Sequence, residues 1–173
     1  MKLKAMYSFL SDDLAAVEEE LERTVRSECG PLGEAALHLL QAGGKRIRPV
    51  FVLLSARFGR YDFERIKHVA VALELIHMAS LVHDDVIDDA DVRRGRPTIK
   101  ARWSNRFAMY TGDYLFARSL ERMAELDSPV LIKCWRKRSL KCATGKSSKS
   151  RINIDLISRF ARTCGASAEK RRY

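Results

Sequence analysis

The chain has 173 residues, of which 46% are hydrophobic and 31% are charged, and this is sufficient for one domain with a buried core. No segment has the length and freedom from charge that a membrane span needs, and the N-terminus lacks the apolar stretch of a signal peptide. The four cysteines have no metal-ligand spacing. We therefore expect a reduced, cytoplasmic protein without stable membrane insertion.

The formal net charge of +10 is distributed unevenly. Residues 128–173 contain 13 lysines and arginines against 2 acidic residues, whereas residues 1–127 are nearly neutral. Three of the four cysteines also lie in this last part. We therefore divide the chain into a domain, residues 1–127, and a basic tail, residues 128–173, whose composition predicts disorder.

The first 127 residues have the apolar periodicity and the boundary residues of helices. Helices are expected to begin near Ser11, Pro31, Pro49, Phe63 and Trp103. No run of residues alternates as a strand would, so the predicted fold class is all-α. Beyond residue 126 the pattern degrades, and residues 134–138 have neither helical nor strand periodicity.

Residues 82–98 carry five aspartates followed by three arginines. On a helix, Asp84 and Asp88 lie one turn apart, with Asp85 adjacent, and carboxylates crowded in this way need a cation. Mg²⁺ is such a cation, and the arginines that follow suit phosphate oxygens. The alternative is a solvated acidic turn. Residues 69–82 are apolar except Glu74, His77 and Ser80, which predicts a buried helix, so we favour a metal–diphosphate clamp.

Three blocks in the first 127 residues resemble the trans-isoprenyl diphosphate synthases, or polyprenyl synthetases. They read Gly-Gly-Lys-Arg-Ile-Arg-Pro at 43–49, His-Asp-Asp-Val-Ile-Asp through Arg-Arg-Gly at 83–95, and Gly-Asp-Tyr-Leu at 112–115. Within this family, the sequence is most similar to the large catalytic subunits of bacterial heptaprenyl diphosphate synthases. The resemblance implies a helical bundle of the isoprenoid synthase type, truncated here.

The resemblance also implies roles for individual residues. The first aspartate-rich motif would bind Mg²⁺ on the allylic diphosphate and serve catalysis through Asp84, Asp85 and Asp88. Arg93 would contact that diphosphate, and the site for isopentenyl diphosphate would comprise Gly44, Lys45, Arg48, His77 and Arg94. A histidine on an apolar face also fits a hydrogen-bonded core residue, and Asp113 also fits a helix cap.

The product length is implied by the residues before the first aspartate motif. Bulky aromatic residues there block the growing chain in this family, whereas this sequence has Ile76, Ala79 and Ser80. The resemblance therefore implies condensation of isopentenyl diphosphate with an allylic diphosphate, farnesyl diphosphate for example, to a long product such as heptaprenyl diphosphate. It further implies a dimer or an assembly with a small regulatory subunit, and no nucleic-acid partner.

The tail departs from the family. The second aspartate-rich motif, a Lys-Thr pair and a glutamine of the family are absent, so we expect this truncated form to be inactive. Codon degeneracy allows a shifted frame from Lys133 onward that resembles the next family segment, and we interpret residues 128–173 as a frameshift product. Two alternatives remain: a nucleic-acid-binding basic tail on a helical domain, and a non-catalytic partner subunit.

Overall fold

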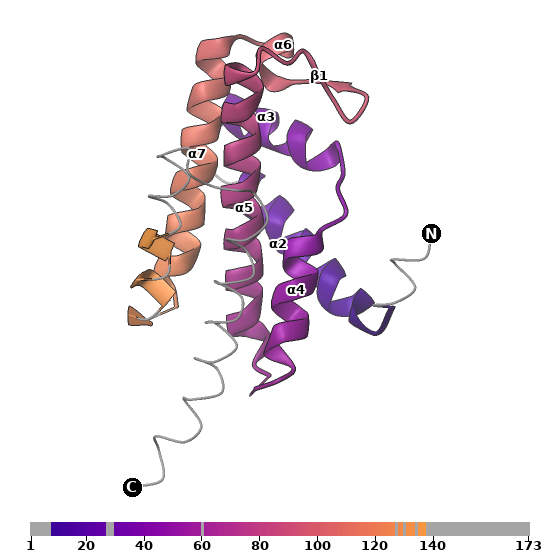
Figure 1. Ribbon diagram of the computed structural model, residues 1–173, viewed down its shortest axis with the longest axis vertical. Coiled ribbons are helices and arrows are strands. Elements are labelled where there is room, and N and C mark those ends of the chain that lie inside the picture. The colour runs from indigo at the N-terminus through magenta and orange to yellow at the C-terminus, as the bar shows by residue number, and fades with distance from the viewer. Residues whose placement is uncertain are drawn as a thin grey trace, which may run out of the picture.

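The computed structural model describes residues 8–26, 30–59, 61–126, 128–129, 131–133 and 135–137. Over these ranges the chain folds into a bundle of helices with one short hairpin at its end (Figure 1). The helical elements are η1 (Ser8–Leu10), α2 (Ser11–Arg26), α3 (Gly30–Gln41), α4 (Ile47–Ala56), α5 (Phe63–Ile87), α6 (Ile99–Arg102) and α7 (Asn105–Ala124). The prediction of an all-α protein is confirmed.

Helices α5 and α7 begin close to the predicted positions, and capping residues precede both. The carboxylate of Asp62 accepts a hydrogen bond from a backbone N–H in the first turn of α5, and the Ser104 hydroxyl does the same for α7. Helix α4 begins at Ile47, earlier than expected, and places Pro49 in its first turn. A proline is tolerated there because a first-turn N–H has no partner within the helix.

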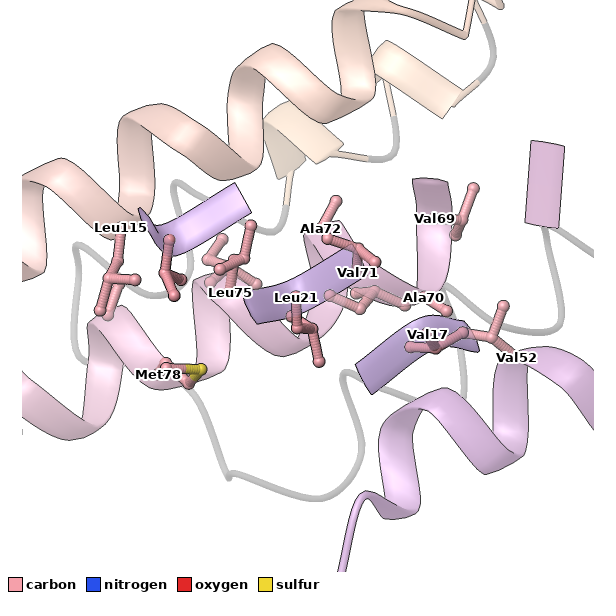
Figure 2. Packing of buried hydrophobic residues seen from close by; sticks show 14 of the residues in the cluster. Val17, Leu21, Val52, Val69, Ala70, Val71, Ala72, Leu75, Met78 and Leu115 are labelled. Atoms are coloured by element: carbon pink, nitrogen blue, oxygen red, sulfur yellow. The ribbon is translucent and has the colours of Figure 1, made fainter. Parts of the chain in front are cut away.

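Helix α5 is the centre of the bundle. Its residues 69–76 are all buried, as expected for a helix that other helices surround. Helix α7 lies along one side of it, and α2 and α4 lie along others (Figure 1). Leu21 of α2, Val52 of α4 and Leu115 of α7 pack into one core with Leu75 of α5 (Figure 2). No helix in the described ranges is long and apolar enough to cross a membrane.

The expectation that no strand would occur is wrong for residues 92–97. Strand β1 (Val92–Arg93) pairs antiparallel with β2 (Arg96–Pro97). The two connecting residues, Arg94 and Gly95, both have positive φ, at 53° and 76°, which suits the twist of a two-residue hairpin turn. Strands of two residues are too short for alternation to reveal them.

The packed structure continues past residue 127. Residues 131–133 and 135–137 are helical, although residues 134–138 have no helical periodicity in the sequence. Leu131 and Trp135 are 5% and 2% exposed and belong to the core. Residues 138–173, the greater part of the predicted basic tail, lie outside the described residues, and the frameshift interpretation stays a prediction.

An ion-pair cluster ties α2 to α7. The Glu20 carboxylate accepts hydrogen bonds of 2.7 Å from Arg23, and the guanidinium of Arg122 lies 3.1 Å from it. Burial raises the pKa of Glu20, but the hydrogen bond from Arg23 and the charge of Arg122 outweigh burial, and its pKa falls below the ordinary 4.5. The folded state therefore favours the ionised carboxylate.

We predict that Glu20→Gln removes an acid-sensitive part of the stability. A lowered pKa stabilises the fold above pH 4.5, and this stabilisation is lost as the pH falls through the folded pKa. The variant should lose about 1–2 kcal/mol at pH 7 and less at pH 3, measured by urea unfolding. Glu121→Gln, which removes the exposed partner of Arg118, is the control with little effect. Equal losses at both pH values would contradict the assignment.

Candidate functional site

The acidic segment forms the C-terminal end of α5. The helix ends at Ile87, and Asp89 follows with a left-handed φ of 51°. The N–H of Ala90 donates to the carbonyl of Asp85 at 2.9 Å, and the N–H of Asp89 donates to that of Val86 at 3.4 Å, which is the Schellman pattern of a helix end. The last turn of α5 therefore contains Asp84 and Asp85, and Asp88 caps it.

Carboxylates at this end of a helix face the negative pole of the helix dipole and need cations nearby. The Asp85 side chain is only 4% exposed, and Arg93 of β1 lies against it, with Nη2 and Nε 2.5 and 2.7 Å from Oδ1. The hydrogen bond to Asp85 raises the pKa of Arg93, and the charges of Asp84 and Asp88 add to this effect. The hairpin thus supplies the cation that the buried carboxylate requires.

The other two aspartates of the segment, Asp89 and Asp91, form ion pairs that hold the fold together. The ammonium group of Lys100, on α6, lies 2.5 Å from Asp89 and 3.1 Å from Asp91. The hydrogen bond from Lys100 lowers the pKa of Asp89. The five aspartates therefore divide into two that anchor α6 and three at the end of α5, and the latter are the three predicted to bind metal.

The donor set at the end of α5 fits a hard divalent cation. Asp84 is half-buried, Asp85 is buried and Asp88 is exposed. The three carboxylates therefore extend from the buried side of the helix end to the solvent. Mg²⁺ needs only one or two protein carboxylates when phosphate oxygens and water complete its shell. Within the described residues, no three His, Cys, Asp or Glu side chains converge into a finished metal site, and Asp85 is turned to Arg93.

The hairpin also reaches the glycine-rich block between α3 and α4. A methyl group placed on Gly44 would lie 2.8 Å from Nη1 of Arg94 and 3.3 Å from Nη1 of Arg46. The guanidinium of Arg94 therefore rests on the backbone of Gly44, and a residue with a side chain would displace it. Two residues predicted to share a substrate site, 50 positions apart in the sequence, are brought together.

The other predicted ligands of isopentenyl diphosphate lie on the adjoining elements. Lys45 is exposed in the loop before α4, and Arg48 is half-buried in the first turn of that helix. His77 is half-buried on α5, and its backbone carbonyl accepts a hydrogen bond of 2.8 Å from Ser80. His77 is therefore not a fully buried core histidine. The contacts of these side chains with a substrate stay predictions.

The residues predicted to set product length follow α5 toward the aspartates. Ile76 and Ala79 are 2% and 3% exposed, and Ser80 is half-buried. Their spacing of three to four residues places them along one side of the helix, leading to Asp84. Ile76 and Ala79 belong to the core of the described residues, and their place beside a growing product stays a prediction.

The sequence interpretation missed a cluster around Arg46. This residue has a φ of 45°, and its guanidinium donates to Glu18 of α2 at 2.6 and 2.7 Å and to the carbonyl of Leu40 at 3.0 Å. It also lies 3.4 Å from the buried carboxylate of Glu74 on α5. One signal was present in the sequence, since a lone glutamate in an apolar helix requires a buried partner.

Gly112 allows α7 to approach α5 next to the aspartates. A methyl group at this glycine would lie 2.2 Å from Nε2 of His83, the residue that precedes Asp84. The interpretation of Asp113 as a helix cap is wrong, because this residue lies inside α7 and is 70% exposed. Its carboxylate is 3.4 Å from Nε2 of His83, so the third block contacts the second.

Comparison with known proteins agrees with this arrangement. The family model described as polyprenyl synthetase matches residues 30–157, and the chain belongs to this family. The match extends past the boundary that the sequence predicted at residue 127. Heptaprenyl diphosphate synthase component 2 of Geobacillus stearothermophilus is 92% identical over 129 residues, which is 75% of this chain and 40% of that protein. The protein of the same name from Bacillus subtilis is 69% identical over 75% of this chain and 37% of that protein.

Solved structures place the fold in the same group. A heptaprenyl diphosphate synthase from Staphylococcus aureus superposes with a TM-score of 0.81 and 35% identity, covering 90% of this chain and 57% of that one. A polyprenyl synthase from Caulobacter crescentus, complexed with calcium and isoprenyl diphosphate, gives 0.83 at 28% identity over 91% of this chain and 55% of that one. The isoprenoid synthase type of helical fold is thus confirmed, and the chain spans about two fifths of its curated relatives.

We predict that Arg93→Gln destabilises the fold by about 1–3 kcal/mol, because it leaves the Asp85 carboxylate buried without a cation. Adding Asp85→Asn should recover part of the loss, and urea unfolding of the two single variants and the double variant measures this coupling. Arg96→Gln, on the exposed partner strand, is the control. Additive losses in the double variant would show that the pair does not act as a unit.

Proposed function

We propose that this chain is the N-terminal part of a long-chain polyprenyl diphosphate synthase that condenses isopentenyl diphosphate with an allylic diphosphate such as farnesyl diphosphate. The observation that carries the proposal is the hairpin, which brings Arg93 to Asp85 and Arg94 to Gly44. One short segment thereby joins the carboxylates to the glycine-rich block. The name of the 92% identical relative supports heptaprenyl diphosphate as the product.

The residues present account for the chemistry that such a reaction needs. Mg²⁺, held by Asp84, Asp85 and Asp88, would supply positive charge to the departing diphosphate. Arg93 stabilises the negative charge that develops on the same diphosphate. Lys45, Arg48, His77 and Arg94, with the backbone of Gly44, hold isopentenyl diphosphate so that its double bond faces the allylic carbon. The buried face of α5 keeps water from the allylic cation.

The proposed assembly follows from the relatives. The relatives from Geobacillus stearothermophilus and Bacillus subtilis are both named component 2, a name for one part of a multi-subunit enzyme. We extend this to the present chain as a dimer or an assembly with a small regulatory subunit in the cytoplasm. A non-catalytic partner subunit would have no need of the three carboxylates at the end of α5. The carboxylates therefore favour the catalytic alternative.

We predict that the 173-residue chain alone does not transfer prenyl groups, because it carries one side of the metal clamp. An extended chain, in which residues 1–127 continue with the remaining sequence of the Geobacillus stearothermophilus relative, should be active. In that chain Asp84→Ala should lower turnover about a hundredfold or more, since it removes a group that acts on developing charge. Incorporation of labelled isopentenyl diphosphate measures this.

The matched control is Asp91→Ala in the extended chain, because Asp91 is bound to Lys100 and has no proposed catalytic role. Its turnover should stay close to that of the parent. Near-normal turnover of the Asp84→Ala variant at saturating Mg²⁺ would contradict the assignment of the metal site.

We predict that Ala79→Phe in the extended chain shortens the product. The ring would project beside the growing isoprenoid one turn before the aspartates. Chromatography of the released products measures chain length, and Ala124→Phe, at an exposed position at the far end of α7, is the control. An unchanged product accompanied by reduced thermal stability would show that Ala79 contacts another helix and does not line the product channel.

A further inference from the structure

The loop of residues 43–46, between α3 and α4, is connected to the rest of the bundle by the side chain of Arg46. This residue adopts a left-handed φ of 45°, which is uncommon for a residue with a side chain and persists where surrounding contacts enforce it. The side chain is 15% exposed and points away from solvent, unlike its exposed neighbour Lys45. Arg46 therefore connects the loop to the bundle, while the residues on either side of it are available for a ligand.

The buried end of this connection is Glu74. Its side chain is 5% exposed in the centre of α5, and Oε1 lies 3.4 Å from Nη1 of Arg46. Burial raises the pKa of Glu74 above its ordinary 4.5, and the charges of Arg46 and Arg48 offset only part of this increase. The Glu74 carboxylate thus lies beneath two arginines of the loop and the following helix. It also stands one turn before His77 on the same helix.

Nη1 of Arg46 lies next to the site where Arg94 contacts the loop, because both guanidinium groups approach the position that a methyl group on Gly44 would occupy. Two like charges this close need a counter-ion to keep the loop and the hairpin together. Glu18 and Glu74 provide it from α2 and α5. Glu18 is 39% exposed, so Glu74 is the partner that solvent cannot replace.

We propose that Glu74 is a positioning residue for the isopentenyl diphosphate site, which it serves by holding Arg46 and thereby the loop that carries Gly44 and Lys45 and leads into Arg48 at the start of α4. This inference rests on the proposed function, since it concerns the same site. Glu74 itself touches no substrate. Its effect passes through Arg46 and the backbone of the loop.

Electrostatics alone gives the opposite expectation, and this makes the proposal testable. A carboxylate beneath a diphosphate site repels the ligand, so Glu74→Gln would tighten binding if charge were its only contribution. A positioning role predicts weaker binding, because the acceptor of the Arg46 hydrogen bond loses its negative charge and holds the loop less firmly. A role confined to folding predicts no change in the affinity of the folded protein.

The experiment measures inorganic pyrophosphate binding to the 173-residue chain by isothermal titration calorimetry, below the onset of thermal unfolding. Glu74→Gln should weaken binding about tenfold, the effect of one lost hydrogen bond to a charged group. It should also speed trypsin cleavage after Lys45, followed by mass spectrometry. Glu121→Gln, on the surface of α7, is the matched charge-removing control and should change neither quantity. Tighter or unchanged binding by Glu74→Gln would overturn the proposal.

Two further variants separate this inference from the proposed function. Lys45→Ala should weaken pyrophosphate binding whether or not Glu74 positions the loop, so a loss there with none in Glu74→Gln rejects the inference alone. If the wild-type chain does not bind pyrophosphate, both the site and the inference fail. If Glu74→Gln does not fold, Arg46→Lys retains the charge and shortens the reach to Glu18 and Glu74. It should weaken binding similarly, and unchanged affinity would reject the positioning role.

Discussion

The carboxylates at the C-terminal end of α5 require positively charged groups nearby, and the surrounding structure depends on this requirement. Negative side chains at the negative pole of a buried helix are stable only with cations in reach. The chain meets this demand by turning back at Asp89 and folding the hairpin against the helix end, so that Arg93 meets Asp85. Lys100 then fixes the exit of the same segment. The position of the hairpin and of α6 follows from this neutralisation.

The burial of α5 makes the helix end a rigid platform. Because residues 69–76 are enclosed by α2, α4 and α7, the helix cannot rotate without exposing apolar surface. The residues of α5 that belong to the proposed site or support it are therefore fixed relative to one another: Glu74 near the glycine-rich loop, His77 one turn further, and Asp84 at the end. A site built on such an element is positioned more accurately than one built on loops alone.

The sequence predicted the features that depend on local patterns. The helix starts at Ser11 and Phe63 followed from apolar periodicity and boundary residues, and the burial of α5 followed from its apolar run. The features it missed are made by contacts distant in the sequence. The hairpin strands are too short to show periodicity. The Arg46 cluster is made by residues of α2, α3 and α5. Trp135 packs into the core although its neighbours in the sequence are basic. Local propensity does not depend on partners that are distant in the sequence, so it does not predict these contacts.

The ion pair between Arg93 and Asp85 also suggests how the proposed site changes when substrate arrives. Without ligand the two side chains neutralise each other, and the buried carboxylate carries no uncompensated charge. A diphosphate bound at the proposed site would offer Arg93 a new anionic partner, and a divalent cation held by the aspartates would offer Asp85 a new cationic partner. Both charges can then exchange partners together, whereas the arrival of either ligand alone would leave one of them unpaired. The proposed site would therefore favour joint binding of metal and diphosphate, because only the joint event would give Arg93 and the buried Asp85 carboxylate new partners together.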